Sequence, residues 1–165
     1  MENVIIRKFE TEDSDRLLEL NHESVHFLSP LTKEKLNSLI LQSETLNVIE
    51  VDGVVEAFVM TLREGKEYDS VNYLWFSNNY DHFLYVDRVV VSLKMHGKGL
   101  GNMLYNSVFS HAKLVGVPYV AAEIDISPPN PGSLRFHEKF GFKEVGKQTV
   151  ADGKKVVSLQ VVTLV

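Results

Sequence analysis

A glycine-rich loop between a predicted strand and a predicted helix is the feature that most constrains the fold of this chain. The stretch 84–112 begins with the β-branched run LYVDRVVV, which predicts a buried strand. Three glycines then stand at alternate positions, Gly97, Gly99 and Gly101. Apolar residues follow at every third or fourth position and predict a helix with one apolar face. They are Leu100, Leu104, Val108, Ala112 and Val115.

The order of strand, glycine loop and helix is typical of an anion site. The first backbone N–H groups of a helix have no partner within the helix, and the helix dipole favours negative charge beside them. Glycine lets the backbone turn sharply and lets a phosphate approach it closely. The stretch therefore predicts a phosphate-binding loop.

Composition narrows the class of protein. The chain has 165 residues, 44% apolar and 24% charged, so we expect one soluble globular domain over residues 1–165. Its net charge of −5 argues against nonspecific binding to nucleic acid or to an anionic membrane. The absence of cysteine excludes disulfides, thiol nucleophiles and cysteine-based metal sites. It also fits a reducing cytosol, so we expect a cytoplasmic protein. The stretch MENVIIRKFE has no apolar core and no apolar run approaches ~18 residues, so we expect neither a signal peptide nor a membrane span.

The chain before the loop predicts a strand, two helices and a hairpin. Residues Val4–Arg7 predict the first strand, and Thr11 or Asp13 is a candidate cap of the first helix. Thr32 opens the second helix, after a loop or kinked helix of sequence HESVHFLSPLT. The pair Asp52-Gly53 between apolar runs predicts a tight turn that joins strands 46–51 and 54–62.

Residues 64–82 lack periodicity but contain five aromatic residues: Tyr68, Tyr73, Trp75, Phe76 and Tyr80. Loops are usually polar, so an aromatic-rich loop needs a reason. We weigh equally a wall of a substrate pocket and a loop that folds onto its own domain or contacts a second subunit. A homodimer through this loop or through the last strand stays open.

The chain after the loop continues a mixed sheet. The short apolar run Tyr119–Ile124 predicts a second buried strand, parallel to Val86–Val91. A short helix follows, capped by Asn130 and ended by Gly141. A last hairpin turns over Asp152-Gly153. The predicted fold is α/β, with a mixed sheet of the α+β kind and helices on its faces.

Two kinds of phosphate site fit the loop poorly. A P-loop needs a hydroxyl residue directly after its lysine, and here Gly99 follows Lys98. A dinucleotide site places its first glycine at the end of the strand, whereas residues 92–96 intervene here, and it belongs at the start of a βαβ series.

Two motifs of the chain resemble the GNAT superfamily of acyl-CoA N-acyltransferases. The segment HGKGLG (His96–Gly101) looks like the acyl-CoA-binding loop of that family, in which Gln or Arg is followed by two residues, Gly, one residue, and Gly or Ala. Downstream, NPGSLRFHEKFGF (Asn130–Phe142) is similar to the segment of the family that ends in Gly-Phe. The resemblance implies a GNAT-like fold with a central mixed sheet of about seven strands and about four helices. It also implies acetyl-CoA as cosubstrate.

The resemblance implies a set of cofactor-binding residues. Backbone groups of the strand residues Val89, Val90 and Val91 would contact the pantetheine and polarise the thioester carbonyl. Amides of the loop would bind the pyrophosphate, and Asn130 and Ser133 are further candidate contacts. The loop residues are His96, Gly97, Lys98, Gly99, Leu100, Gly101 and Asn102.

Two positions depart from the family pattern. His96 stands where the family has Gln or Arg, and a neutral imidazole still donates one hydrogen bond. His137 stands where many members have a tyrosine that protonates the departing thiolate. A histidine titrates near neutral pH, so His137 is a candidate general acid, or else a half-buried histidine that only packs near the cofactor. Tyr85 is a second candidate acid, or else part of the substrate wall.

Attack by an amine on a thioester requires a proton acceptor, because a free alkyl amine has a pKa of ~10.4. Asp87 is the best candidate base, since a carboxylate in an apolar strand is costly unless it is paired, solvated or functional. A salt bridge with Arg88 or Arg63, or contact with a substrate ammonium, is the alternative. Glu123 on the neighbouring strand is a weaker candidate.

We therefore expect an N-acetyltransferase that moves an acetyl group from acetyl-CoA to a primary amine of a small molecule or peptide through a tetrahedral intermediate. The alternatives are a noncatalytic acyl-CoA-binding module and a nucleotide-dependent oxidoreductase. Four scattered histidines show no metal-ligand spacing, so we expect no metal: His22, His26, His82 and His111. The acceptor pocket is expected from residues 22–31 and from the aromatic segment.

Overall fold

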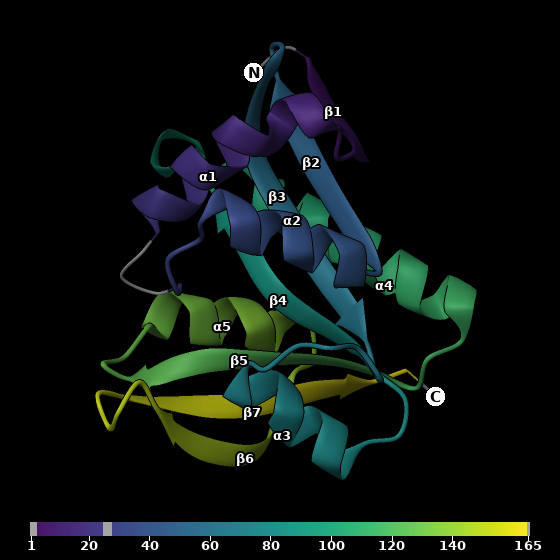
Figure 1. Cartoon of the computed structure of the whole chain (residues 1–165), viewed down its shortest axis with the longest axis vertical. Coiled ribbons are helices and arrows are strands. Elements are labelled where there is room, and N and C mark those ends of the chain that lie inside the picture. Colours follow the sequence, from purple (N-terminus) through teal and green to yellow (C-terminus); the bar gives the residue numbers. More distant parts are fainter. Residues whose placement is uncertain (1–2, 25–27, 165) are drawn as a thin grey trace. The chain divides into compact units, whose positions relative to one another are not determined.

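The structure is a computed structural model that describes residues 3–24 and 28–164 (Figure 1). These residues form seven strands and five α-helices, with two short 3₁₀ helices. The strands are β1 (Val4–Lys8), β2 (Thr45–Val51), β3 (Val54–Arg63), β4 (Leu84–Val91), β5 (Tyr119–Ser127), β6 (Lys143–Val150) and β7 (Lys155–Thr163). The α-helices are α1 (Ser14–Glu23), α2 (Lys33–Gln42), α3 (Val71–Asn79), α4 (Leu100–Val115) and α5 (Pro131–Lys139). The 3₁₀ helices are η1 (Thr11–Asp13) and η2 (Leu93–Met95).

The strands are hydrogen-bonded in the order β1-β2-β3-β4-β5-β7-β6. Strands β4 and β5 are parallel, with Leu84 opposite Val120 and Tyr85 opposite Ala121, which confirms the predicted parallel pair. The pairs β1–β2, β2–β3, β5–β7 and β6–β7 are antiparallel. The sheet is therefore mixed, as predicted.

The chain forms two compact units. The first unit contains Met1–Leu62 and Val86–His111, and the second contains Arg63–Tyr85 and Ala112–Val165. Strand β4 contributes its first two residues to the second unit and the rest to the first. The prediction of a single domain over residues 1–165 stays a prediction.

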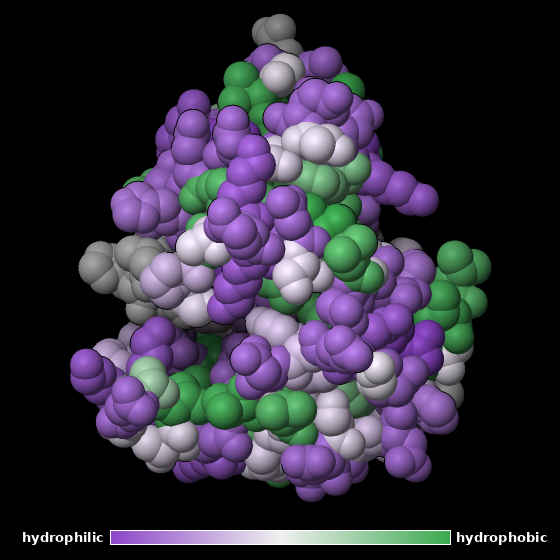
Figure 2. Space-filling view, in the orientation of Figure 1, coloured by the Kyte–Doolittle hydropathy of each residue, from purple (hydrophilic) through white to green (hydrophobic). Residues whose placement is uncertain are grey.

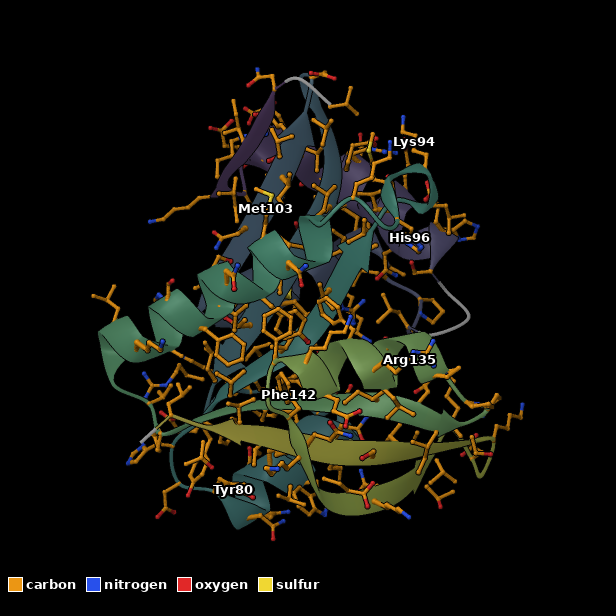
Figure 3. All side chains as sticks on the ribbon, turned by 180° about the vertical axis from the view of Figure 1, so that it is seen from behind. Tyr80, Lys94, His96, Met103, Arg135 and Phe142 are labelled. Carbon is orange, nitrogen blue, oxygen red and sulfur yellow. The ribbon has the colours of Figure 1, made fainter. Side chains whose placement is uncertain are left out.

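In the first unit, helices cover both faces of the strands. Figures 1 and 3, which show opposite sides, place α1 and α2 on one face of β1–β3 and α4 on the other. Figure 2 shows mainly hydrophilic side chains over α1 and α2, so these helices direct their apolar sides inward. The predicted turn between β2 and β3 is confirmed, with φ of 51° at Asp52 and 84° at Gly53. The buried apolar side chains include Leu17, Leu20, Leu36, Val48, Ile49, Phe58 and Met60.

An ion cluster joins β1 to the segment before α1. Two nitrogens of Arg7 donate to the carboxylate of Asp13 at 2.8 and 2.9 Å, and its Nε donates to Glu50 at 2.9 Å. The Arg7 guanidinium holds the pKa of Asp13 below its usual value. Asp13 stands at the N-cap of α1, yet its carboxylate accepts from Arg7 and from the N–H of Glu10 and does not cap that helix. The predicted helix is therefore confirmed, whereas the predicted capping hydrogen bond from Thr11 or Asp13 is wrong.

The second unit contains α3 in place of the predicted aromatic loop. Ser70 caps this helix by accepting from the N–H of Tyr73, and the side chains of Tyr73 and Phe76 are buried. A Cβ added at Gly146 of β6 would lie 2.6 Å from Trp75, so α3 packs directly on that strand (Figure 1). The helix has apolar residues on several sides, which removes the one-sided periodicity that predicts a surface helix. The fold class is confirmed with five helices, one more than expected.

The helix α5 follows β5 as predicted. Asn130 accepts from the N–H of Ser133 at 3.3 Å, Pro131 occupies the first turn, and Gly141 ends the segment with a φ of 91°. The last hairpin is also confirmed, with positive φ from Ala151 to Gly153. None of the described helices is long and apolar enough to cross a membrane. The predicted loop or kinked helix over residues 22–32 includes residues 25–27, which lie outside the described residues.

Candidate functional site

The glycine loop has an open backbone in front of α4. Gly97 and Gly99 have φ of 77° and 85°, a region that side chains other than glycine rarely adopt. A Cβ added at either position would meet no atom within 4 Å. Leu100 is buried and begins α4, whereas the residues from His96 to Gly99 are exposed. The loop thus presents its backbone amides beside the start of a 16-residue helix, the arrangement that binds phosphate.

The predicted cofactor residues of the first unit lie in one continuous segment. Strand β4 ends at Val91, η2 fills residues 93–95, and the loop leads into α4, which contains Gly101 and the exposed Asn102. Val90 is buried, and Val89 and Val91 are half-buried. Figure 3 shows Lys94 and His96 on this segment between β4 and α4.

His96 turns back toward the strand that precedes it. Its Nε2 lies 2.9 Å from the carbonyl oxygen of Val91, which can only accept, so Nε2 carries the proton. In the neutral ring Nδ1 is then an acceptor. The one N–H group of the neutral His96 ring, which was expected to bind the cofactor, therefore donates to Val91 instead.

Asp87 forms the ion pair that was the alternative to a catalytic role. Its Oδ2 lies 2.8 Å from Nε of Arg88, and both side chains are almost completely buried. The guanidinium of Arg88 also donates to Asn21 at 2.9 Å and to Ser29 at 3.3 Å. Arg63, the other predicted partner, pairs with Glu64 instead. Arg88 therefore balances the charge of Asp87 and connects β4 to α1.

In the second unit, Tyr85 and Glu123 form a hydrogen bond across β4 and β5. The Tyr85 hydroxyl donates to Glu123 Oε2 at 2.7 Å. The ring of Tyr85 packs edge-on against Tyr73 of α3, with centroids 5.5 Å apart. The helix that sequence patterns missed therefore helps to hold one of the predicted catalytic residues.

His137 lies in α5 with one nitrogen bound to the backbone. Its Nδ1 donates to the carbonyl oxygen of Ser133 at 2.7 Å, and its ring is 5.1 Å from that of Phe142. Burial lowers the pKa of His137, and the backbone hydrogen bond to Ser133 opposes this shift only in part. In the neutral form Nε2 is thus an acceptor, and delivery of a proton from Nε2 requires the charged ring.

The predicted site residues divide between the two units. The first unit contains Asp87, Val89–Val91 and the loop residues, and the second contains Tyr85, Asn130, Ser133 and His137. Within the described residues, no group of three His, Asp or Glu side chains could hold a metal ion. Among the histidines, His82 lies beside Glu64, His111 pairs with Glu44, and His26 lies outside the described residues.

Glu56 is absent from the predicted site residues although the same signal marks it. It stands in the apolar run VVEAFVM of β3, as Asp87 stands in the apolar run of β4. Only 1% of Glu56 is exposed, and its carboxylate pairs with Arg16 and Lys94. The same sequence signal, a carboxylate within an apolar strand, therefore identifies two buried ion-paired residues of the first unit, Asp87 and Glu56.

Comparison with known proteins identifies the class. The chain matches the acetyltransferase (GNAT) family over residues 7–142, and it belongs to that family. It is accordingly an acyltransferase that uses acetyl-CoA as its cosubstrate. The open glycine loop fits the pyrophosphate of that cosubstrate.

Solved structures share the fold at low sequence identity, although no curated protein matches the chain. One is yncA, a putative acetyltransferase from Salmonella typhimurium with its cofactor acetyl-CoA (20% identity, TM-score 0.73, 99% of this chain and 95% of that one). A second is the NatC complex bound to Gag peptide and CoA (9%, 0.78, 99% of each). A third is a putative phosphinothricin N-acetyltransferase (22%, 0.77, 99% of each).

Replacement of His96 by arginine, a residue that the family uses there, should strengthen acetyl-CoA binding. The neutral imidazole gives its proton to Val91, whereas a guanidinium has donors to spare for a phosphate. A charge-assisted hydrogen bond lowers Kd by about 10-fold, measured by isothermal titration calorimetry. His111→Arg, which adds the same charge near the other end of α4, should leave Kd unchanged. Equal or weaker binding by His96→Arg would show that His96 does not face the phosphate.

Proposed function

We propose that this protein transfers an acetyl group from acetyl-CoA to a primary amine of a small molecule or a peptide. The observation that carries the proposal is the open glycine loop at the start of α4, in a chain of the GNAT family. Titration with acetyl-CoA, followed by an assay of CoA release with a panel of amines and peptides, tests it. Absence of acetyl-CoA binding at millimolar concentration would refute it.

The proposed acceptors include both small amines and peptides, because the structural relatives differ in the molecules that their names mention. One relative is named for phosphinothricin, and another is bound to a Gag peptide and CoA. The net charge of −5 supports the further proposal that the protein has no nucleic acid partner, and the absence of cysteine supports the further proposal of a cytoplasmic protein. A homodimer stays a prediction.

On the cofactor side, the chain supplies mainly backbone groups. We assign the pyrophosphate to the amides from Gly97 to Asn102 and the pantetheine to the backbone of Val89–Val91. Exposed amides at a helix start stabilise a diphosphate without a cationic side chain. Asn130 and Ser133, which form the cap of α5, are the proposed contacts from the second unit.

On the acceptor side, a proton must leave the amine. A tetrahedral intermediate forms when the neutral amine attacks the thioester carbonyl, so the ammonium has to lose a proton first. We assign this proton to Asp87, whose carboxylate is held in β4 by Arg88. In this scheme Arg88 fixes the position of the carboxylate through their 2.8 Å ion pair.

The departing thiolate needs a proton, and two residues can supply it. His137 donates through Nε2 only when the ring is charged, because Nδ1–H is given to Ser133. Its lowered pKa makes the charged form scarce at neutral pH and also makes it a stronger acid. Tyr85, whose hydroxyl donates to Glu123, is the second proposed donor.

Replacement of Gly99 by glutamate should abolish acetyl-CoA binding. The new side chain would place bulk and negative charge in the loop, where a Cβ meets no protein atom. Gly53→Glu is a matched control, because Gly53 has a similar φ of 84° and equally open surroundings in the β2–β3 turn. Calorimetry should detect no binding for Gly99→Glu and a normal Kd for the control. Normal binding by Gly99→Glu would place the pyrophosphate elsewhere.

Replacement of Asp87 by asparagine should lower kcat by about 10²–10⁴-fold and leave the Kd of acetyl-CoA unchanged. The amide keeps the shape of the carboxylate but cannot take the proton. Glu50→Gln, which alters another arginine-paired carboxylate of the first unit, should keep kcat. Loss of acetyl-CoA binding together with kcat would make Asp87 a structural partner of Arg88 and not a base.

Replacement of His137 by phenylalanine should slow turnover by about 10-fold or more with acetyl-CoA affinity kept. Phenylalanine preserves the packing against Phe142 but has no proton to give. If the charged ring is the acid, wild-type kcat falls as pH rises through the lowered pKa of His137, below the usual ~6.5. The variant should lack that fall. Unchanged turnover would leave His137 with a structural role.

A further inference from the structure

A buried carboxylate lies beside the segment that leads into the glycine loop. Glu56 of β3 is 1% exposed, and it is joined to α1 and to η2 by its side chain and to Ser92 by its backbone. We propose that Glu56 is a positioning residue for the acetyl-CoA-binding loop. It acts through the segment 92–96 and does not touch the cosubstrate. This inference rests on the proposed function of the loop.

Two cations compensate the buried charge of Glu56. Arg16 of α1 donates through Nη2 to Oε1, and Lys94 of η2 lies with its Nζ 3.2 Å from Oε2. Burial by itself lowers the pKa of Arg16, and the carboxylates of Glu19 and Glu56 raise it above its usual value. A buried carboxylate with charged partners is costly to break apart, because either remaining charge loses its compensation. The pairing therefore fixes Lys94 against β3.

The backbone of the same segment is also anchored. The N–H of Ser92 donates to the carbonyl oxygen of Glu56 at 2.8 Å, and the N–H of Leu93 donates to Glu23 of α1 at 3.3 Å. Three consecutive residues, Ser92, Leu93 and Lys94, thus bind to β3 or α1. Figure 3 shows Lys94 on this segment and His96 two residues further on, at the entrance of the loop.

The loop itself has few means of holding its shape. Gly97 and Gly99 have no side chains, and a Cβ at either position would meet nothing within 4 Å. The conformation of such a loop is set by its two ends, here α4 through the buried Leu100 and the anchored segment before His96. Amides that bind a diphosphate must be held close to their productive positions, since misplacement by about 1 Å is costly. An anchor at the segment 92–96 is therefore an anchor of the phosphate site.

Charge and position predict opposite effects when Glu56 becomes glutamine. Loss of one negative charge near Arg16 and Lys94 makes the entrance of the loop more positive, which by itself strengthens binding of an anion. Loss of the anchor lets the segment and the amides move, which weakens binding. The sign of the change in Kd therefore separates positioning from electrostatics.

The test is calorimetric titration of acetyl-CoA into the wild type, Glu56→Gln and the control Asp13→Asn. We expect Kd to rise about 10-fold in Glu56→Gln. Asp13 is a matched control, because its carboxylate is also buried and arginine-paired in the first unit but accepts from Arg7 and from the N–H of Glu10, and not from the segment 92–96. Asp13→Asn should lower the melting temperature and leave Kd unchanged. Glu56→Asp, which keeps the charge, should lie between the wild type and Glu56→Gln.

Lys94→Met keeps the proposal testable if Glu56→Gln does not fold. Lys94 is 67% exposed and Arg16 still pairs with Glu56 in its absence, so its replacement should disturb folding less than Glu56→Gln. In 0.5 M salt we expect the Kd of Lys94→Met to be about threefold above that of the wild type. At this ionic strength the Debye length is about 4 Å, so the lost charge of Lys94 has little direct effect on the bound anion. An equal Kd under these conditions would overturn the role of the ion pair.

The outcomes separate the two proposals. Wild-type binding with equal or tighter binding by Glu56→Gln would overturn the positioning role and leave the proposed function intact. Weaker binding by Asp13→Asn to the same extent would also overturn it, because general loss of stability would then explain both variants. No binding by the wild type would overturn the proposed function, and the positioning role with it.

Discussion

The exposed backbone amides at the start of α4 are the constraint on which the site depends. They can bind an anion only if no side chain covers them, and glycines at positions 97 and 99 meet this condition with left-handed backbone that other residues avoid. Such a loop cannot hold itself in place. The buried start of α4 and the anchored segment after β4 supply that rigidity, so binding and stability are divided between different residues.

Two carboxylates inside apolar strands illustrate how burial and function are connected. A buried carboxylate is costly without a cation beside it. Asp87 pairs with Arg88, and Glu56 pairs with Arg16 and Lys94. In both cases the paired cation also joins the strand to α1 or to η2. A buried ion pair of this kind does little for net stability but fixes the position of the elements that it joins.

Local patterns predicted much of the fold because turns and caps are decided by neighbouring residues. The Asp-Gly turns, the cap at Asn130 and the loop into α4 each depend on a few residues within one stretch, and all were predicted. Helix α3 was missed because its aromatic residues are buried on several sides, so no single apolar face marks it. The capping hydrogen bond of Asp13 was predicted wrongly because its carboxylate accepts from Arg7, six residues away in sequence.

The sequence by itself determined the kind of site: a glycine loop between a strand and a helix, and a second motif at Asn130–Phe142, which together point to coenzyme A. Only the tertiary structure decided the partners of the charged groups. Arg88 meets Asn21 across 67 residues and Arg16 meets Glu56 across 40, and His137 gives one ring proton to the backbone of its own helix. Backbone conformation is encoded locally, whereas the charge, tautomer and reach of a side chain depend on what the fold brings beside it.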